Sequence, residues 1–230
     1  DSKAGLALEA TAGALKIGRA TAAGNLSLTT SGTGANAGDI QADNLTTTFA
    51  SGGTTTINSS RDVRLGLAVS SGAMKIDSVG STRATNLQTT VAGSGITVTA
   101  GSANLTGVDS AGALALTANN GALIVDIAKA ATTAELKTIA PGGTDVTVNT
   151  SLTSGQAATV TSRGNARLSD VKATTGDVII SAANGEVTGV GAGAAKLTAV
   201  TGKIDVTGGT LARLGDVDSK LDLKVAADTI

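Results

Sequence analysis

The sequence predicts an all-β chain wound into a parallel β-helix, with about 20 residues per coil and roughly 11 coils. Three observations predict this fold: apolar residues alternate with polar ones along the whole chain, the alternation recurs at a fixed spacing, and aromatic residues are almost absent. The 230 residues include 31 Gly, one Phe, one Met and one Pro, with no Trp, Tyr, His or Cys. This composition favours a thin core of small aliphatic side chains.

Alternation with a period of two residues predicts short strands that each bury one face. Many of these segments follow a glycine, as at Gly24, Gly112 and Gly176. We expect every apolar member of such a segment to point into the core. The clearest segments are Leu6/Leu8, Leu15/Ile17, Leu26/Leu28, Val63/Leu65/Leu67/Val69, Met74/Ile76, Ile96/Val98, Leu114/Leu116, Leu123/Val125/Ile127, Val146/Val148, Val178/Ile180, Ile204/Val206 and Leu221/Leu223/Val225.

The spacing of these segments predicts the coil length. Apolar anchors recur most often about 10 residues apart, and strong segments lie two intervals apart. Such pairs, each separated by 20 residues, are Leu8 and Leu28, Leu116 and Leu136, and Val160 and Ile180. The repeat is therefore near 20 residues and divides into two strands of about five residues.

A β-sandwich is the alternative architecture for many short strands. Hairpins favour Asn-Gly or Asp-Gly turns, yet Asn-Gly occurs only at 120–121 and 184–185, and Asp-Gly is absent. A sandwich core also normally includes aromatic side chains. A parallel β-helix instead stacks Val, Ile, Leu and Ala at a strand spacing of ~4.8 Å. The sequence favours the β-helix.

Two segments fit the repeat less well. Residues 127–140 (IAKAATTAELKTIA) have helix-forming composition and precede Pro141, but Leu136 keeps the 20-residue spacing, so we favour two strands joined by an Ala-rich turn. Residues 31–53 are the least regular, with Ile40, Leu45 and Phe49 fitting only loosely, and a loop or strand excursion is expected there. No change in composition marks a boundary, so residues 1–230 are assigned to one domain.

Composition excludes several classes of function. Without His or Cys the chain cannot build the common zinc, haem or iron–sulfur sites, a His-based catalytic triad or thiol chemistry. A net charge of −1 and the lack of an aromatic platform disfavour nucleic-acid binding. The uncharged stretch from Ala84 to Val108 is interrupted by Gly, Ser and Thr, so no transmembrane segment is expected.

The remaining motifs for chemistry are weak, and we expect no catalytic, cofactor or metal site. Asp216, Asp218 and Asp222 could suggest Ca²⁺, but Lys220 occupies the place of a third oxygen ligand. The glycines of 189–193 resemble a phosphate loop without its spacing or its helix, and are better explained as turn glycines with positive φ. The chain is not expected to be an enzyme, because its acids are mostly isolated: Asp39, Asp43, Asp62, Asp77, Asp109, Asp126 and Asp145.

Surface residues offer three further hypotheses. Some cations could line up on one face of the rod and bind sulfated glycans, although we favour ordinary solubilising charges as the explanation; they are Lys3, Lys16, Arg19, Arg61 and Arg64. Five Asn-x-Ser/Thr triplets could accept glycans, at Asn25, Asn44, Asn58, Asn104 and Asn149. The clusters Thr46–Thr48 and Thr54–Thr56 could suggest ice binding, but they do not repeat in register, and hydrogen-bonded Thr ladders are the simpler interpretation.

Three coils carry a resemblance to a known family. Residues 23–30 (AGNLSLTT), 111–118 (AGALALTA) and 175–182 (TGDVIISA) are similar to filamentous-haemagglutinin repeats. Such repeats build large exoproteins of Gram-negative bacteria that are exported by two-partner secretion. The resemblance covers essentially the whole chain, although its repeats are degenerate in 31–53 and 127–143.

The resemblance implies a right-handed parallel β-helix displayed as a fibre on the bacterial surface. It implies an outer-membrane transporter as the export partner, and host-cell glycans or receptors as candidate ligands. The segment would be an adhesive shaft or a passive stalk for a distal toxin or receptor-binding tip. The chain begins at Asp1 without an initiator Met and lacks the Asn-Pro motifs of the family's secretion domain, so we expect an internal fragment of a longer fibrous protein.

The inside and outside assignments can be tested by substitution. Leu114→Asp and Val178→Asp would bury a charge in the thin core and destabilise the fold severely. Replacing the polar neighbours Thr117 or Asp177 is expected to cost little.

Overall fold

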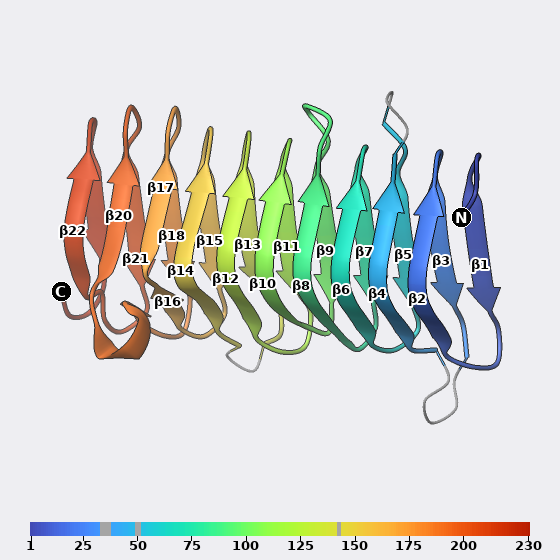
Figure 1. Cartoon of the computed structure of the whole chain (residues 1–230). Helices are drawn as coiled ribbons and strands as arrows, with labels where there is room; N and C mark the ends of the chain where they lie inside the picture. The colour runs from blue at the N-terminus through green and yellow to red at the C-terminus, as the bar shows by residue number, and fades with distance from the viewer. Residues whose placement is uncertain (33–37, 49–51, 142–143) are drawn as a thin grey trace.

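The chain forms a rod of stacked coils in a computed structural model that describes residues 1–32, 38–48, 52–141 and 144–230. Each coil contributes strands to two parallel sheets that form the walls of the rod, and the termini lie at opposite ends (Figure 1). One sheet has 11 strands and the other has 12. The predicted parallel β-helix is thus confirmed, as a β-solenoid of about ten turns.

The first wall, called the short-strand sheet, consists mostly of five-residue strands. Every pair of neighbours in it is parallel. Its strands, in stacking order, are β1 (Leu6–Ala10), β3 (Leu26–Thr30), β5 (Thr55–Ser59), β7 (Met74–Ser78), β9 (Ile96–Ala100), β11 (Leu114–Ala118), β13 (Ala134–Thr138), β15 (Ala158–Ser162), β18 (Val178–Ala182), β21 (Ile204–Gly208) and β23 (Leu223–Ala226).

The second wall, called the long-strand sheet, has strands of up to nine residues. In two coils the strand is divided in two, and one division contains the 3-10 turn η1 (Val190–Ala192). The strands are β2 (Leu15–Ala22), β4 (Ile40–Thr47), β6 (Val63–Ser70), β8 (Ser81–Thr89), β10 (Ser102–Ser110), β12 (Leu123–Ala130), β14 (Val146–Ser154), β16 (Ala166–Leu168) with β17 (Asp170–Ala173), β19 (Val187–Thr188) with β20 (Ala195–Ala199), and β22 (Leu214–Ser219).

The register confirms the 20-residue repeat that the sequence predicts. Leu8 pairs with Leu28, Leu116 with Leu136, and Val160 with Ile180. Other coils have different lengths: Leu26 pairs with Thr55, 29 positions later, and Leu114 pairs with Ile96, 18 positions earlier. The strands therefore stack in fixed register while the turns absorb insertions and deletions.

The core is aliphatic, as expected, but strict alternation fails in the long-strand sheet. On β6, Val63 and Leu65 are buried, and so are Ala68 and Ser70, while Leu67 lies between them on the outer side. The long strand bends after its third residue, so its inward positions change phase there. The prediction that Leu67, Val69 and Ile127 point inward is therefore wrong, and the Ile127 side chain is 43% exposed.

Strand length and the last coil also differ from expectation. We expected two five-residue strands per coil, but most long-strand elements have eight or nine residues because each bends around one corner of the coil. Leu221 and Leu223 were expected in the core and are 64% and 52% exposed. β23 pairs only with β21, so nothing in the structure covers its other edge.

The two less regular segments contain ordinary strands. Residues 127–140 end β12 and form β13, as predicted, with Leu136 fully buried. Residues 40–47 form the regular strand β4, in which Ile40 and Leu45 are buried, so the expected excursion does not include them. Phe49 lies outside the described residues. The only helical element of the described part is η1.

Small hydroxyl side chains at the ends of the strands close the turns. The buried Ser110 hydroxyl donates to the Ala113 carbonyl at 2.8 Å, and the buried Ser162 hydroxyl donates to the Asn165 carbonyl at 2.8 Å. Such bonds satisfy backbone carbonyls that the corner of the coil removes from water. Ser and Thr residues at the ends of strands therefore contribute hydrogen bonds to the fold.

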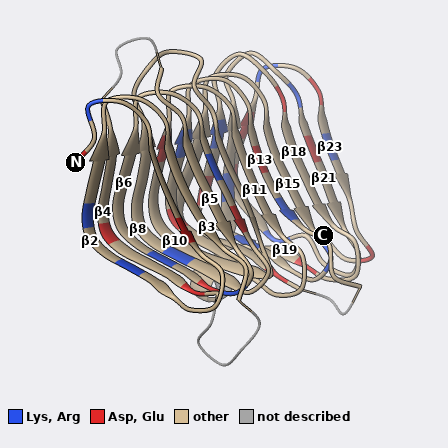
Figure 2. Ribbon diagram, turned by 90° about the vertical axis from the view of Figure 1, so that its right-hand side faces the viewer, with Lys and Arg blue, Asp and Glu red and all other residues tan. Residues whose placement is uncertain are grey.

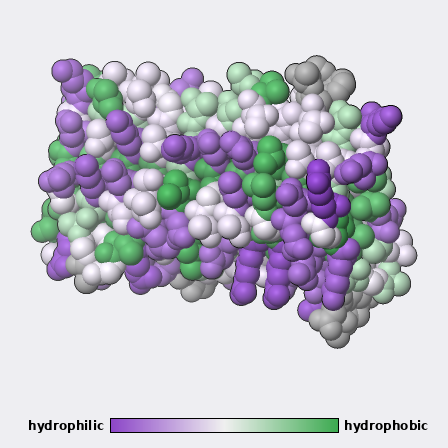
Figure 3. Space-filling model, viewed as in Figure 1, coloured by the Kyte–Doolittle hydropathy of each residue, from purple (hydrophilic) through white to green (hydrophobic). Residues whose placement is uncertain are grey.

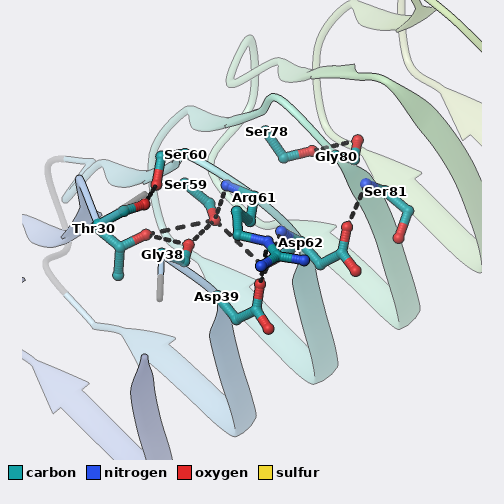
Figure 4. A network of polar contacts seen from close by, with 11 residues as sticks. Thr30, Gly38, Asp39, Ser59, Ser60, Arg61, Asp62, Ser78, Gly80 and Ser81 are labelled. Carbon is teal, nitrogen blue, oxygen red and sulfur yellow. Dashed lines mark hydrogen bonds and ion pairs between the residues drawn. The ribbon is translucent and has the colours of Figure 1, made fainter. Parts of the chain in front are cut away.

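Carboxylates that precede the strands join one coil to the next (Figure 4). The Asp62 backbone N–H donates to Asp39 Oδ1 at 3.3 Å, and the Ser81 N–H donates to Asp62 Oδ1 at 2.7 Å. The same contact recurs further along the rod, where the Asn165 N–H donates to Asp145 Oδ1 at 2.8 Å. Several acids that appear isolated in the sequence therefore serve as acceptors for turn N–H groups.

Glycines allow neighbouring turns to approach closely. A Cβ atom at Gly112 would lie 2.4 Å from the Gly93 carbonyl oxygen, and one at Gly202 would lie 2.2 Å from the Gly176 carbonyl oxygen. No side chain fits between turns stacked at the strand spacing of ~4.8 Å. Glycines are thus needed at these positions for close approach.

Candidate binding surface

One outward row of the long-strand sheet places basic and amide side chains on five consecutive strands. Lys16 on β2 pairs with Gln41 on β4, Gln41 pairs with Arg64 on β6, Arg64 pairs with Arg83 on β8, and Arg83 pairs with Asn104 on β10. These five residues, called the basic row here, lie about 4.8 Å apart along the rod axis. Lys and Arg positions follow one another across these strands near the N-terminal end (Figure 2).

The side chains of the basic row are exposed and uncommitted. All five residues are exposed. Within the described residues, neither Lys16 nor Arg64 nor Arg83 forms an ion pair, and Gln41 and Asn104 form no side-chain hydrogen bond. Hydrophilic side chains gather over the same strands in the space-filling view (Figure 3). The row therefore presents three free positive charges and two free amides to solvent.

Several cations elsewhere on the rod have acidic partners. Lys75 lies 2.6 Å from Asp77, Lys196 lies 4.0 Å from Asp170, and Lys224 lies 3.8 Å from Asp205. Arg167 occupies the same outward row as Arg64, further along the sheet, and is bonded to Asp145. Other cations, such as Arg19, Lys129 and Lys172, also form no ion pair within the described residues, so what distinguishes the basic row is the stacking of its side chains on consecutive strands.

Two adjoining hollows follow the basic row. One, of about 390 Å³, is lined by side chains that include Gln41, Arg64, Arg83 and Asn104. The other, of about 210 Å³, is lined by side chains that include Lys16, Gln41 and Arg64. Since Gln41 and Arg64 line both, the hollows form one shallow groove across successive strands.

The bend of the long strands shapes this groove. Gly66 lies at the bend of β6, where a Cβ atom would be 2.4 Å from the Asp43 carbonyl oxygen. The close approach of β4 and β6 at this point requires glycine. The floor of the groove is consequently backbone, and its sides are the longer polar side chains of the row.

Three carboxylates lie at the groove and reduce its positive charge. Asp39 forms an ion pair with Arg61, at 3.6 Å, and accepts the Asp62 N–H. Asp62 in turn accepts the Ser81 N–H. Asp43 is exposed beside the bend and has no ion-pair partner among the described residues. Asp43 is therefore the one acid of the three whose carboxylate neither accepts a hydrogen bond nor forms an ion pair within the described residues.

The structure brings together only part of the basic surface that the sequence suggests. Lys16 and Arg64 share the basic row, whereas Arg61 lies in a turn beside Asp39. Arg19 lies beyond the bend of β2, beside Asn44, and Lys3 precedes β1. Sequence reasoning missed Arg83, which stacks directly on Arg64, and the amides of Gln41 and Asn104. Arg64 precedes the buried Leu65, and Arg83 precedes the buried Ala84. Because successive side chains of a strand alternate, both arginines point outward, and the register places them side by side.

The other candidates do not assemble into a site. Asp216 and Asp218 are exposed on β22, while Asp222 contributes its backbone carbonyl, which accepts the Ile204 N–H at 3.0 Å. In the part of the chain that the structure describes, no group of three or more acidic, His or Cys side chains could hold a metal ion. Likewise, no helix of this part is long and apolar enough to cross a membrane.

The glycines of 189–193 form the 3-10 turn inserted before β20. Only Gly191 has positive φ, at 64°, whereas Gly189 and Gly193 have φ near −75° and −73°. The expectation of positive φ is therefore right for Gly191 and wrong for the other two. The N–H groups of Gly189 and Gly193 donate to backbone carbonyls within the turn, so they are not free to hold a phosphate.

The Asn-x-Ser/Thr positions and the Thr clusters have different surroundings. The side-chain Oδ1 of Asn25 accepts the Thr54 N–H, and the Asn149 side-chain amide donates to Asp126, while Asn104 is exposed without such a bond. Asn44 and Asn58 are partly buried. Thr46 stacks beside Thr21 and Val69, and Thr47 and Thr55 are buried, so the two Thr clusters do not form a flat outward array.

Comparisons of the chain with models of known families, with curated proteins and with solved structures gave no match. The rod and the basic row are therefore the features from which a function can be inferred.

Proposed function

We propose that this rod is a shaft segment of a secreted bacterial surface adhesin that mediates attachment to host cells. The observation that supports the proposal is continuous stacking: two parallel sheets run the length of the chain around one aliphatic core. Stacking of about ten turns at ~4.8 Å gives a rod roughly 50 Å long. Such a rod holds a binding surface at a distance from the membrane, and each strand exposes alternate side chains along its wall.

The proposal includes export through an outer-membrane transporter of the two-partner type. It is supported by the resemblance of residues 23–30, 111–118 and 175–182 to filamentous-haemagglutinin repeats, and by the absence of cysteine from the whole chain. A chain without cysteine forms no disulfide that would hinder passage in an unfolded state. We propose no enzymatic activity, because Asp39, Asp62 and Asp145 accept hydrogen bonds from turn N–H groups.

A passive stalk is the second candidate function. It is favoured by the pairing of several wall cations with acids and by the absence of Trp and Tyr, which dominate binding hot spots. In this case a distal toxin or receptor-binding tip would make the contact with the target cell, and this segment would set only its distance.

Cell binding of the purified, fluorescently labelled protein separates the two functions. Flow cytometry on epithelial cells, in competition with unlabelled protein, measures whether the segment itself attaches. Saturable binding that the unlabelled protein displaces supports an adhesive shaft. No binding by a folded, monodisperse sample supports the passive stalk.

A further inference from the structure

The basic row stacks like charges in a way that the fold itself does not need. Arg64 and Arg83 lie directly opposite each other on β6 and β8. Like charges at directly paired positions of neighbouring strands destabilise a sheet. Neither side chain has an acidic partner that offsets this repulsion. An anion bound across the two guanidinium groups would remove the cost.

We propose that the basic row binds a linear acidic polysaccharide that lies along the rod axis across β2, β4, β6, β8 and β10. The inference rests on the proposed adhesive function and names the chemical class of its ligand. Arg guanidinium groups bind carboxylates or sulfates through charge-assisted, often bidentate, hydrogen bonds. The Gln41 and Asn104 amides can donate to and accept from sugar hydroxyl groups.

The geometry of the groove matches an extended polymer. Its binding groups recur at the strand spacing of ~4.8 Å, which is comparable to the length of one sugar unit in an extended chain. The two adjoining hollows share Gln41 and Arg64, so a chain can pass from one to the other without a break. Because the Gly66 bend leaves backbone at the floor, the sugar rings can lie close to the sheet.

The shape also favours a polysaccharide over nucleic acid. The groove has no aromatic side chain on which a base could stack, and its three cations are accompanied by the carboxylates of Asp39, Asp43 and Asp62. Asp43 provides a sensitive indicator of the ligand's charge. Removing its carboxylate should strengthen binding of an anionic chain and leave binding of a neutral sugar unchanged.

The test is titration of the 230-residue protein with four polymers at about 0.15 M salt. The probes are polygalacturonate as the carboxylated chain, heparin as the sulfated chain, dextran as the neutral chain and single-stranded DNA. We expect saturable binding of polygalacturonate or heparin, with the tighter of the two identifying the acid group. We expect no binding of dextran and weaker binding of DNA.

Variants locate the site. The pair Arg64→Gln and Arg83→Gln should weaken binding about a hundredfold, because each charged hydrogen-bond partner contributes roughly 1.4 kcal/mol, or about tenfold. The matched control is the pair Arg167→Gln and Lys196→Gln, which changes net charge equally at cations with acidic partners and should leave affinity unchanged. Asp43→Asn should raise affinity. Thermal unfolding should show all variants folded, with no loss of stability for the Arg64/Arg83 pair.

Four outcomes overturn the proposal: no binding of either acidic polysaccharide, equal weakening by the control pair, tighter binding of DNA, or equal binding of dextran. The parallel cell-binding assay separates this failure from that of the adhesive function. If neither acidic polysaccharide binds but cells do, attachment uses another surface and only the polysaccharide site is wrong. If acidic polysaccharide binds but cells do not, the site stands and the adhesive function fails.

Discussion

The Ser78 and Thr82 hydroxyl groups lie 2.8 Å apart inside the core, where they share a hydrogen bond across the corner between β7 and β8. Thr55 offers a contrast. It is 1% exposed, stacks between Leu26 and Met74, and its hydroxyl has no hydrogen-bond partner in the described part of the chain. A buried hydroxyl without a partner destabilises the folded state, whereas a paired one need not.

Thr55→Val should therefore stabilise the protein. The substitution keeps the shape of the side chain and removes a buried, unpaired hydroxyl, so the free energy of unfolding should rise by about 1 kcal/mol. In a thermal melt this corresponds to roughly 2–4 °C for a chain of this size. Thr82→Val is the matched control and should be destabilising, because it removes the shorter of the two hydrogen bonds of the Ser78 hydroxyl and leaves only the 3.3 Å bond to the Gly80 carbonyl. Equal shifts for the two variants would contradict this account of the core hydroxyls.

Close approach of the turns predicts the cost of a glycine substitution. Gly112→Ala would place a methyl group 2.4 Å from the Gly93 carbonyl oxygen, so two neighbouring turns must separate. We expect a loss of about 1–3 kcal/mol in unfolding free energy, measured by urea denaturation. Gly18→Ala on β2 is the control, since a Cβ there meets nothing within 4 Å. If Gly18→Ala costs as much as Gly112→Ala, turn stacking does not explain the glycines.

The fold could be predicted from the sequence because its signal is local and repeated. A 20-residue coil returns Leu116 to Leu136 and Val160 to Ile180 without any knowledge of distant contacts. The bend in the long strands could not be predicted in the same way. Leu67 and Ile127 continue the apolar alternation in sequence, and only packing of Ala68 and Ala128 into the corner shows that the phase has changed.

The candidate site was harder to predict because it depends on coil lengths that vary. Lys16 pairs with Gln41, 25 positions later, and Arg64 pairs with Arg83, 19 positions later. A uniform 20-residue spacing aligns neither pair. The role of Asp177 could not be predicted either, because it depends on a contact with the next coil. The Asp177 Oδ1 accepts the Lys203 N–H from that coil. Replacing Asp177 should therefore cost more than we expected from the sequence, and Thr117 is the better neutral control for Leu114→Asp.

Two apolar residues on β12 test the change of phase at the bend. Val125 is fully buried and Ile127 is 43% exposed, although only Asp126 separates them. Val125→Asp should bury an unpaired charge and destabilise by more than about 4 kcal/mol, or prevent folding. Ile127→Asp should cost no more than about 1 kcal/mol. Circular dichroism in a urea titration measures both losses of stability. A severe loss of stability for Ile127→Asp would contradict the change of phase and support strict alternation along the strand.

Carboxylates between coils predict a difference among acids that look alike in the sequence. Asp62 Oδ1 accepts the Ser81 N–H at 2.7 Å, so Asp62→Ala leaves a turn N–H without its acceptor and should cost about 1–2 kcal/mol. Asp62→Asn keeps a carbonyl oxygen at the same position and should retain most of the stability. Asp109→Ala is the control, because Asp109 is exposed and makes no side-chain hydrogen bond or ion pair within the described residues. If urea denaturation gives the same unfolding free energy for Asp62→Ala and Asp109→Ala, the contact between coils contributes nothing to stability. The ranking we expect, with Asp62→Ala alone destabilised, would show that the Asp62 carboxylate stabilises the rod by joining one turn to the next.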